Sequence, residues 1–210
     1  MIITKKMTEQ ITEQLKIKEL VAIPASETEY LELAQTLPFK IEYHNCEIIT
    51  MGLATLWHEA ITSNVIWILQ NLFIEREDIL VMSSNTGIQI QKFEGGYYMP
   101  DVLVVKGNPQ FKENSKCIIN NPFIIVEVLS DSTANFDRIE KLEEYQTLES
   151  LQHIIFVHQK KVSVSTYTRT DKPNTWINQN FKELTDSFSV EESTISVRDI
   201  YRKIQFEKSI

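Results

Sequence analysis

The spacing of hydrophobic residues predicts a chain in which strands and helices alternate. Residues 122–129 form an apolar run interrupted only by Glu127, and such a run is typical of a strand that is buried on both faces. Residues 102–105 repeat this pattern directly after Asp101. Burying an unpaired carboxylate costs several kcal/mol, so each acid needs a cation or a proton. Two acids on two buried strands therefore suggest a metal site.

Helical spacing is strongest in residues 56–73, where apolar side chains recur every three or four positions. The pattern predicts a helix that packs across a sheet. His58 lies in its first turns, where it could point at a site on that sheet; the alternative is a structural or capping role. Ser26 and Glu29 have the spacing of a capping box, which predicts a short helix that Pro38 ends.

Shorter strands are predicted on either side of these elements. Residues 39–51 are interpreted as two strands that turn near His44 and Asn45, with Glu42 and Glu47 at solvent-facing positions. Alternation of apolar and polar residues predicts strands at residues 85–93 and 162–166, and an apolar run predicts another at residues 151–157.

Length and composition favour an ordinary globular protein. Of 210 residues, 24% are charged and 42% are hydrophobic, which suits one domain with a sizeable core. We interpret residues 1–25 as an N-terminal arm or peripheral helix and residues 26–210 as a single domain. The apolar runs are too short to cross a bilayer, and residues 1–14 lack a signal-peptide core, so we expect a cytoplasmic protein without a membrane partner. Cys46 and Cys117 lack metal-binding or redox spacing and are expected to be reduced.

The charge balance limits how the chain could meet nucleic acid. The formal net charge is −8, and binding to phosphates depends mostly on Lys and Arg. Any contact with DNA must therefore use a local basic patch. No phosphate-binding loop of the GxxxxGK[ST] type, GxGxxG fingerprint or Ser-His-Asp pattern is present, so P-loop nucleotide hydrolysis and dinucleotide redox chemistry are not expected.

Three blocks of sequence together resemble a known family. They are PDVLVV, then NPFIIVEVLSDST, then Asp137-Arg138 followed by Lys141 and Tyr145. These blocks are similar to the Uma2 family of restriction-endonuclease-like proteins, which belongs to the PD-(D/E)XK nuclease superfamily. The resemblance runs from about residue 30 to residue 168 and implies an α/β fold with a restriction-endonuclease-like core, in which helices flank a mixed central β-sheet.

The resemblance also implies a set of site residues. Asp101 and Glu127 would ligate a divalent metal, Mg²⁺ or Mn²⁺. In the superfamily a lysine stands two residues after the second acid, where this chain has Leu129; Lys141, on the following helix, would take over its role. His58 would match the position of a glutamate on the first core helix and support the site.

These features predict a Mg²⁺-dependent endonuclease that hydrolyses phosphodiester bonds in DNA, because a carboxylate-bound Mg²⁺ neutralises phosphate charge and activates water. The alternative is a catalytically inactive relative that binds nucleic acid or a protein partner. A homodimer is also expected, since nucleases of this superfamily frequently pair.

Each site residue has a structural alternative. Asp101 could cap a turn, Glu127 could form a buried ion pair, and Lys141 could pair with Asp137 one helical turn away. If Lys141 serves the site, Lys141→Ala should leave folding nearly intact and abolish cleavage.

Overall fold

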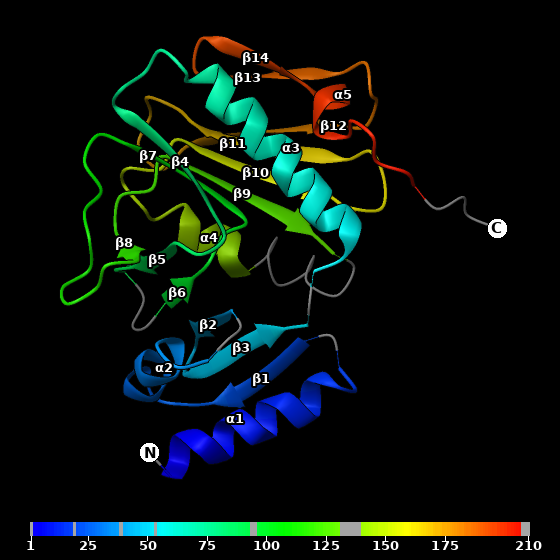
Figure 1. Cartoon of the computed structure of the whole chain (residues 1–210). Helices are drawn as coiled ribbons and strands as arrows, with labels where there is room; N and C mark the ends of the chain where they lie inside the picture. The colour runs from blue at the N-terminus through cyan, green and yellow to red at the C-terminus, as the bar shows by residue number, and fades with distance from the viewer. Residues whose placement is uncertain are drawn as a thin grey trace.

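The computed structural model describes residues 2–18, 20–37, 40–52, 54–92, 96–130 and 140–206. Their strands form two six-stranded sheets and a two-stranded hairpin (Figure 1). The elements in chain order are α1 (Ile2–Leu15), β1 (Leu20–Pro24), α2 (Glu27–Ala34), β2 (Ile41–His44), β3 (Glu47–Met51), α3 (Leu56–Leu72), β4 (Ile79–Ser83), β5 (Gly87–Ile90), β6 (Gly96–Tyr98), β7 (Val102–Lys106), β8 (Ile118–Ile119), β9 (Ile124–Leu129), α4 (Leu142–Tyr145), β10 (His153–His158), β11 (Val164–Arg169), β12 (Trp176–Phe181), β13 (Ser187–Val190), β14 (Ser193–Ser196) and α5 (Val197–Ile200).

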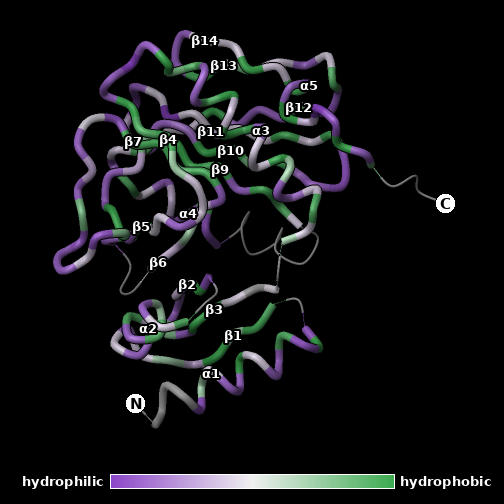
Figure 2. The backbone as a smooth tube through the Cα atoms, viewed as in Figure 1, coloured by the Kyte–Doolittle hydropathy of each residue, from purple (hydrophilic) through white to green (hydrophobic). Residues whose placement is uncertain are grey.

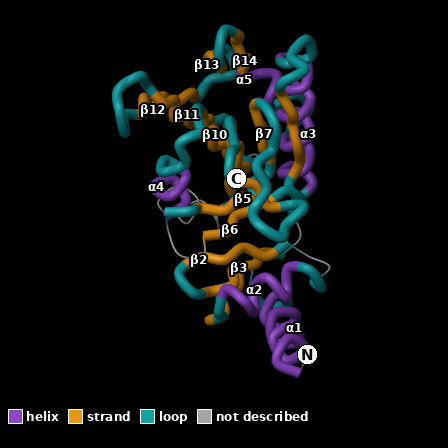
Figure 3. The backbone as a smooth tube through the Cα atoms, turned by 90° about the vertical axis from the view of Figure 1, so that its left-hand side faces the viewer, coloured by secondary structure: helices purple, strands orange, loops and turns teal. Residues whose placement is uncertain are grey.

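The central sheet has the strand order β12-β11-β10-β9-β7-β4 and is mixed. Its middle strand β9 pairs parallel with β10 and antiparallel with β7. Every residue of β9 is buried, as its apolar run predicts, because both faces of the sheet are covered. Helices α3 and α4 lie on opposite sides of this sheet (Figure 3). The predicted α/β class with a mixed central sheet is therefore confirmed.

The second sheet has the order β1-β3-β2-β6-β5-β8. Helices α1 and α2 pack against its first strands, around a core that includes Ile11, Tyr30 and Tyr43. In Figure 1 the blue strands β1, β2 and β3 of this sheet lie below the central sheet, and its green strands β5, β6 and β8 lie nearer to the central sheet. The hydrophobic stretches in Figure 2 follow the strands of both sheets, whereas the connecting loops are mostly hydrophilic.

Several predicted elements are found where the sequence indicates them. The helix predicted at 56–73 is α3, with Thr55 as its N-cap. The predicted capping box starts α2: the Glu29 backbone N–H donates to the Ser26 side chain, and the Glu29 carboxylate accepts from the Ser26 backbone N–H. The strands predicted at 85–93, 151–157 and 162–166 correspond to β5, β10 and β11.

Two interpretations need correction. The segment 1–25 contains not only the helix α1 but also β1, which pairs with β3 over Leu20–Pro24. Glu42, interpreted as solvent-facing, is only 1% exposed. Both faces of its strand β2 are covered, because Ile41 and Tyr43 pack into the core with α1 and α2 on one face. On the other face, Glu42 contacts Lys141 and the Met99 backbone N–H.

None of the described helices is long and apolar enough to cross a membrane. Cys46 and Cys117 are free and exposed. The start of the helix predicted to carry Lys141 falls in residues 131–139, outside the described residues, and its described end is α4.

Candidate active site

The two predicted acids lie on neighbouring strands and on the same face of the central sheet. Register pairs Val102 of β7 with Val126 of β9. Asp101 and Glu127 each adjoin one member of this pair. Side chains alternate along a strand, and the alternate residues Leu103 and Ile125 belong to the core on the α4 side of the sheet. Asp101 lies two residues from Leu103, and Glu127 lies two residues from Ile125, so their side chains are on this same side of the sheet. The site therefore lies between the central sheet, α4 and the second sheet.

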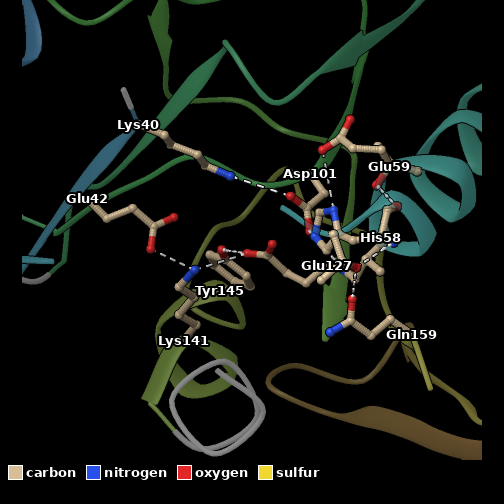
Figure 4. Close-up of polar contacts among 12 residues, drawn as sticks. Lys40, Glu42, His58, Glu59, Asp101, Glu127, Lys141, Tyr145 and Gln159 are labelled. Carbon is tan, nitrogen blue, oxygen red and sulfur yellow. Dashed lines mark hydrogen bonds and ion pairs between the residues drawn. The ribbon is translucent and has the colours of Figure 1, made fainter. Parts of the chain in front are cut away.

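Asp101 is held by three donors from three different parts of the chain (Figure 4). The backbone N–H of Val128 donates to Oδ2 at 2.8 Å, and His58 Nε2 lies 3.1 Å from the same oxygen. Lys40 Nζ lies 3.5 Å from Oδ1. The start of α3, the β9 backbone and the segment before β2 thus all converge on one carboxylate.

These contacts shift three pKa values. Burial acts to raise the pKa of Asp101, but the charge of Lys40, the contact with His58 and the Val128 N–H outweigh it and hold that pKa well below its usual range. Burial acts to lower the pKa values of Lys40 and His58, yet Asp101 raises both. Asp101 is therefore kept as an anion beside the Lys40 ammonium and the His58 ring.

Glu127 receives its partners from the α4 region. The Tyr145 hydroxyl donates to Glu127 Oε1 at 2.6 Å, and Lys141 Nζ donates to the same oxygen at 3.4 Å. The carboxylate is 4% exposed. Such burial requires compensation of its charge, which these two donors supply.

Lys141 lies between the two sheets. Its Nζ is 2.8 Å from Glu42 Oε2 on β2, on the side opposite to Glu127. Glu42 is fixed in turn by the Met99 backbone N–H, which donates to Oε1 at 2.9 Å. Lys141 is only 1% exposed. The alternative pairing of Lys141 with Asp137 falls outside the described residues.

The structure therefore places the four predicted site residues in two groups of contacts. His58 lies with Asp101, and Lys141 lies with Glu127 (Figure 4). No cluster of three or more His, Cys, Asp or Glu able to hold a metal occurs within the described ranges.

Two residues of the site, Lys40 and Glu42, are not among those predicted from the sequence. Both come from the second sheet or its edge, and the signal in the sequence is weak: β2 alternates Ile41 and Tyr43 with Glu42 and His44, as a half-exposed strand would. Only the packing of the second sheet against the α4 region places Glu42 beside Lys141. That contact is tertiary and leaves no local pattern.

Comparisons with known proteins agree with this fold. The family model Uma2, described as "Putative restriction endonuclease", matches residues 28–198. Two uncharacterized proteins of Synechocystis sp. are similar: sll1609 is 33% identical over 141 residues, covering 67% of this chain and 78% of that protein, and slr1290 is 28% identical over 183 residues, covering 86% and 93%.

A solved structure is also similar. A crystal structure from Anabaena variabilis, described as a "putative nuclease belonging to DUF820", superposes with a TM-score of 0.63 at 19% identity, covering 85% of this chain and 98% of that one. At this identity the likeness establishes a shared fold. The family model, by contrast, spans most of the chain, and so this protein belongs to the Uma2 family.

Proposed function

We propose that this protein is a divalent-metal-dependent endonuclease that hydrolyses phosphodiester bonds in DNA. The observation that carries the proposal is the placement of Asp101 and Glu127 on one face of two paired strands, with the Lys141 ammonium 3.4 Å from Glu127. Membership of the Uma2 family, whose description is "Putative restriction endonuclease", supports it. We further propose that the chain works as one domain in the cytoplasm, as a homodimer.

The donor set suits a hard cation. Asp101 and Glu127 would hold Mg²⁺ or Mn²⁺, because such ions accept one or two protein carboxylates and take their remaining ligands from water and substrate phosphates. The lowered pKa of Asp101 keeps that ligand anionic. When bound, the ion would offset the charge that develops on the phosphate and lower the pKa of a water molecule.

The remaining residues would bind and orient. His58 and the Val128 N–H both contact Asp101 Oδ2 and fix the direction of its carboxylate. The Tyr145 hydroxyl does the same for Glu127. Once the second sheet moves away from α4, Lys141 would donate to an oxygen of the scissile phosphate, where its charge would stabilise the transition state. The side chain of Lys40, 29% exposed, would attract the phosphate from the solvent side.

A binding protein without catalytic activity is the second candidate. The burial of Lys141 favours it, because an ammonium that is 1% exposed and paired with Glu42 cannot contact a phosphate in this packing. Such a protein would bind nucleic acid or a protein partner without cleaving DNA.

A plasmid-nicking assay separates the two candidates. Supercoiled DNA is incubated with purified protein and Mg²⁺ or Mn²⁺, and nicked product is measured over time. Asp101→Asn keeps an oxygen that can accept the Val128 N–H but removes the anion, so nicking should fall by about a hundredfold or more. Asp171→Asn makes the same change at an exposed loop position and should nick at the wild-type rate.

Two results would contradict the nuclease proposal. Equal nicking by wild type and Asp101→Asn would assign the activity to another site or to a contaminant. A wild type that retards DNA in a gel but leaves it intact with both metals would support the binding protein instead.

A further inference from the structure

The strand β12 is an edge strand that lacks the usual protection against pairing. It is the last strand of the central sheet, and β11 is its only partner among the described strands. Ile177 is 54% exposed, and the next three residues are also exposed. No charged residue or proline occurs from Asn174 to Phe181, whereas natural edge strands generally carry such residues to block association.

The hydrogen-bond pattern identifies which backbone groups of β12 face outward. The Thr170 N–H donates to the Thr175 carbonyl at 2.9 Å, next to the register pair Arg169 and Trp176. Hydrogen-bonded and non-hydrogen-bonded pairs alternate in an antiparallel ladder. Residues 177, 179 and 181 therefore bond to β11, and the N–H and C=O groups of residues 176, 178 and 180 point away from the sheet.

The sequence of β12 is compatible with pairing to itself. In an antiparallel pair centred on Gln179, Ile177 lies opposite Phe181 of a second copy, and Asn178 lies opposite Asn180. Ile177, Gln179 and Phe181 share one face of the strand, so apolar side chains meet across the axis and amides meet amides. No like charges are brought together within the strand.

We propose that β12 pairs antiparallel with β12 of a second copy of this chain about a two-fold axis at Gln179, joining two central sheets into one. Asn178 and Asn180 would exchange backbone hydrogen bonds across this axis. A second copy of the chain is the partner that fits this edge. In both directions from Gln179, the strand has first an asparagine and then an apolar residue. The strand is separated from β9 by β11 and β10. The inference assigns a surface to the homodimer proposed above and does not depend on nuclease activity.

Gln179 gives a sharp test, because it would meet itself at a non-hydrogen-bonded position, where side chains lie closest. Oligomeric state is measured by size exclusion with light scattering over a concentration series. Wild type is expected to dimerise, whereas Gln179→Lys and Gln179→Glu, which each oppose like charges, should be monomeric. An equimolar mixture of these two variants should recover the dimer, since opposite charges then face each other.

The controls address folding and non-specific charge effects. Gln70→Lys makes the same substitution at an exposed position of α3 and should remain dimeric. Hydrogen exchange of the wild type needs no variant: the amides of Asn178 and Asn180 should exchange more slowly in concentrated than in dilute protein. A monomeric wild type at its highest soluble concentration, dimeric single variants, or a mixture that stays monomeric would each overturn the proposal.

Discussion

At the scale of single residues, Lys141 is held by charge on two sides, and removing it should affect folding. Its Nζ lies 2.8 Å from Glu42 and 3.4 Å from Glu127, and all three side chains are buried. Losing one member of a buried ion group typically costs 3–5 kcal/mol, because the other charges remain without a partner. We therefore expect Lys141→Met to lower the free energy of unfolding by about 3–5 kcal/mol in urea.

This expectation replaces the simpler one drawn from the sequence, in which Lys141→Ala would leave folding nearly intact. Adding Glu42→Gln to Lys141→Met should recover part of the loss, since one of the unpaired carboxylates is then removed. Lys182→Met, at an exposed position, should change stability by no more than about 0.5 kcal/mol. If Lys141→Met is as stable as Lys182→Met, the ion group contributes nothing to folding.

His44 makes stability depend on pH near neutrality. Its hydrogen bond to Glu144 raises its pKa; burial acts in the opposite direction, and Glu140 adds to the increase. Tyr98 also contacts the ring. Because the folded-state pKa is raised, the stabilisation is complete below the usual His pKa of about 6.5 and is lost as pH rises through the raised value.

Urea unfolding of wild type and His44→Gln across this range measures the effect. The stability advantage of wild type over the variant should be largest on the acidic side and should shrink as pH rises. Parallel curves for the two proteins would mean that His44 titrates alike in the folded and unfolded chains.

At the scale of elements, the sequence predicts those whose pattern is set locally. The periodicity of α3, the capping box of α2 and the apolar run of β9 each follow from residues close together in the chain, and all three are found. The strand β1 has no such signal, because its pairing with β3 decides its conformation. In the sequence, Glu127 stands out as a break in an apolar run and Asp101 as an acid directly before another. The position of Glu42, by contrast, depends on its tertiary contact with Lys141.

The hairpin between β2 and β3 gives a prediction at this scale. Asn45 and Cys46 have φ values of 49° and 62°, the left-handed pair that a two-residue turn with Asn-Gly favours. A side chain at the second position is strained there. Cys46→Gly should therefore raise the free energy of unfolding, by up to about 1 kcal/mol after the entropy cost of glycine.

The matched control is Cys46→Ala, which removes the sulfur but keeps Cβ. It should not stabilise the protein, because the strain at positive φ remains. Both free energies are measured by urea denaturation in the presence of a reductant. A gain in Cys46→Ala equal to that in Cys46→Gly would point to the thiol rather than the backbone.

At the scale of the whole molecule, the candidate site exists only because two sheets and two helices meet. Lys40 and Glu42 belong to the second sheet or its edge, Glu127 to the central sheet, and Lys141 adjoins α4. The net charge of −8 opposes DNA at long range, so the proposed contact with DNA would depend on the local ammonium groups. Because Lys141 is buried, we expect the second sheet to shift away from α4 before a phosphate reaches it.

The proposed metal site would link metal binding to the stability of the entire fold. Asp101 and Glu127 come together only in the native sheet, so an ion held by both stabilises the folded state over the unfolded one. At a free metal concentration of about 100 times Kd, the gain is about 2.7 kcal/mol. We therefore expect Mn²⁺ or Mg²⁺ to raise the Tm of wild type by several degrees, and EDTA to reverse the rise.

Asp101→Asn should abolish this metal-dependent rise in Tm, because it removes one of the two proposed anionic ligands. The control Asp171→Asn, in an exposed loop, should retain the rise. Thermal unfolding followed by circular dichroism, with and without metal, gives both values. An equal rise in Asp101→Asn and wild type would locate the ion elsewhere in the molecule. Because this measurement does not depend on DNA cleavage, it tests the metal ligands even if the protein proves to be a binding module.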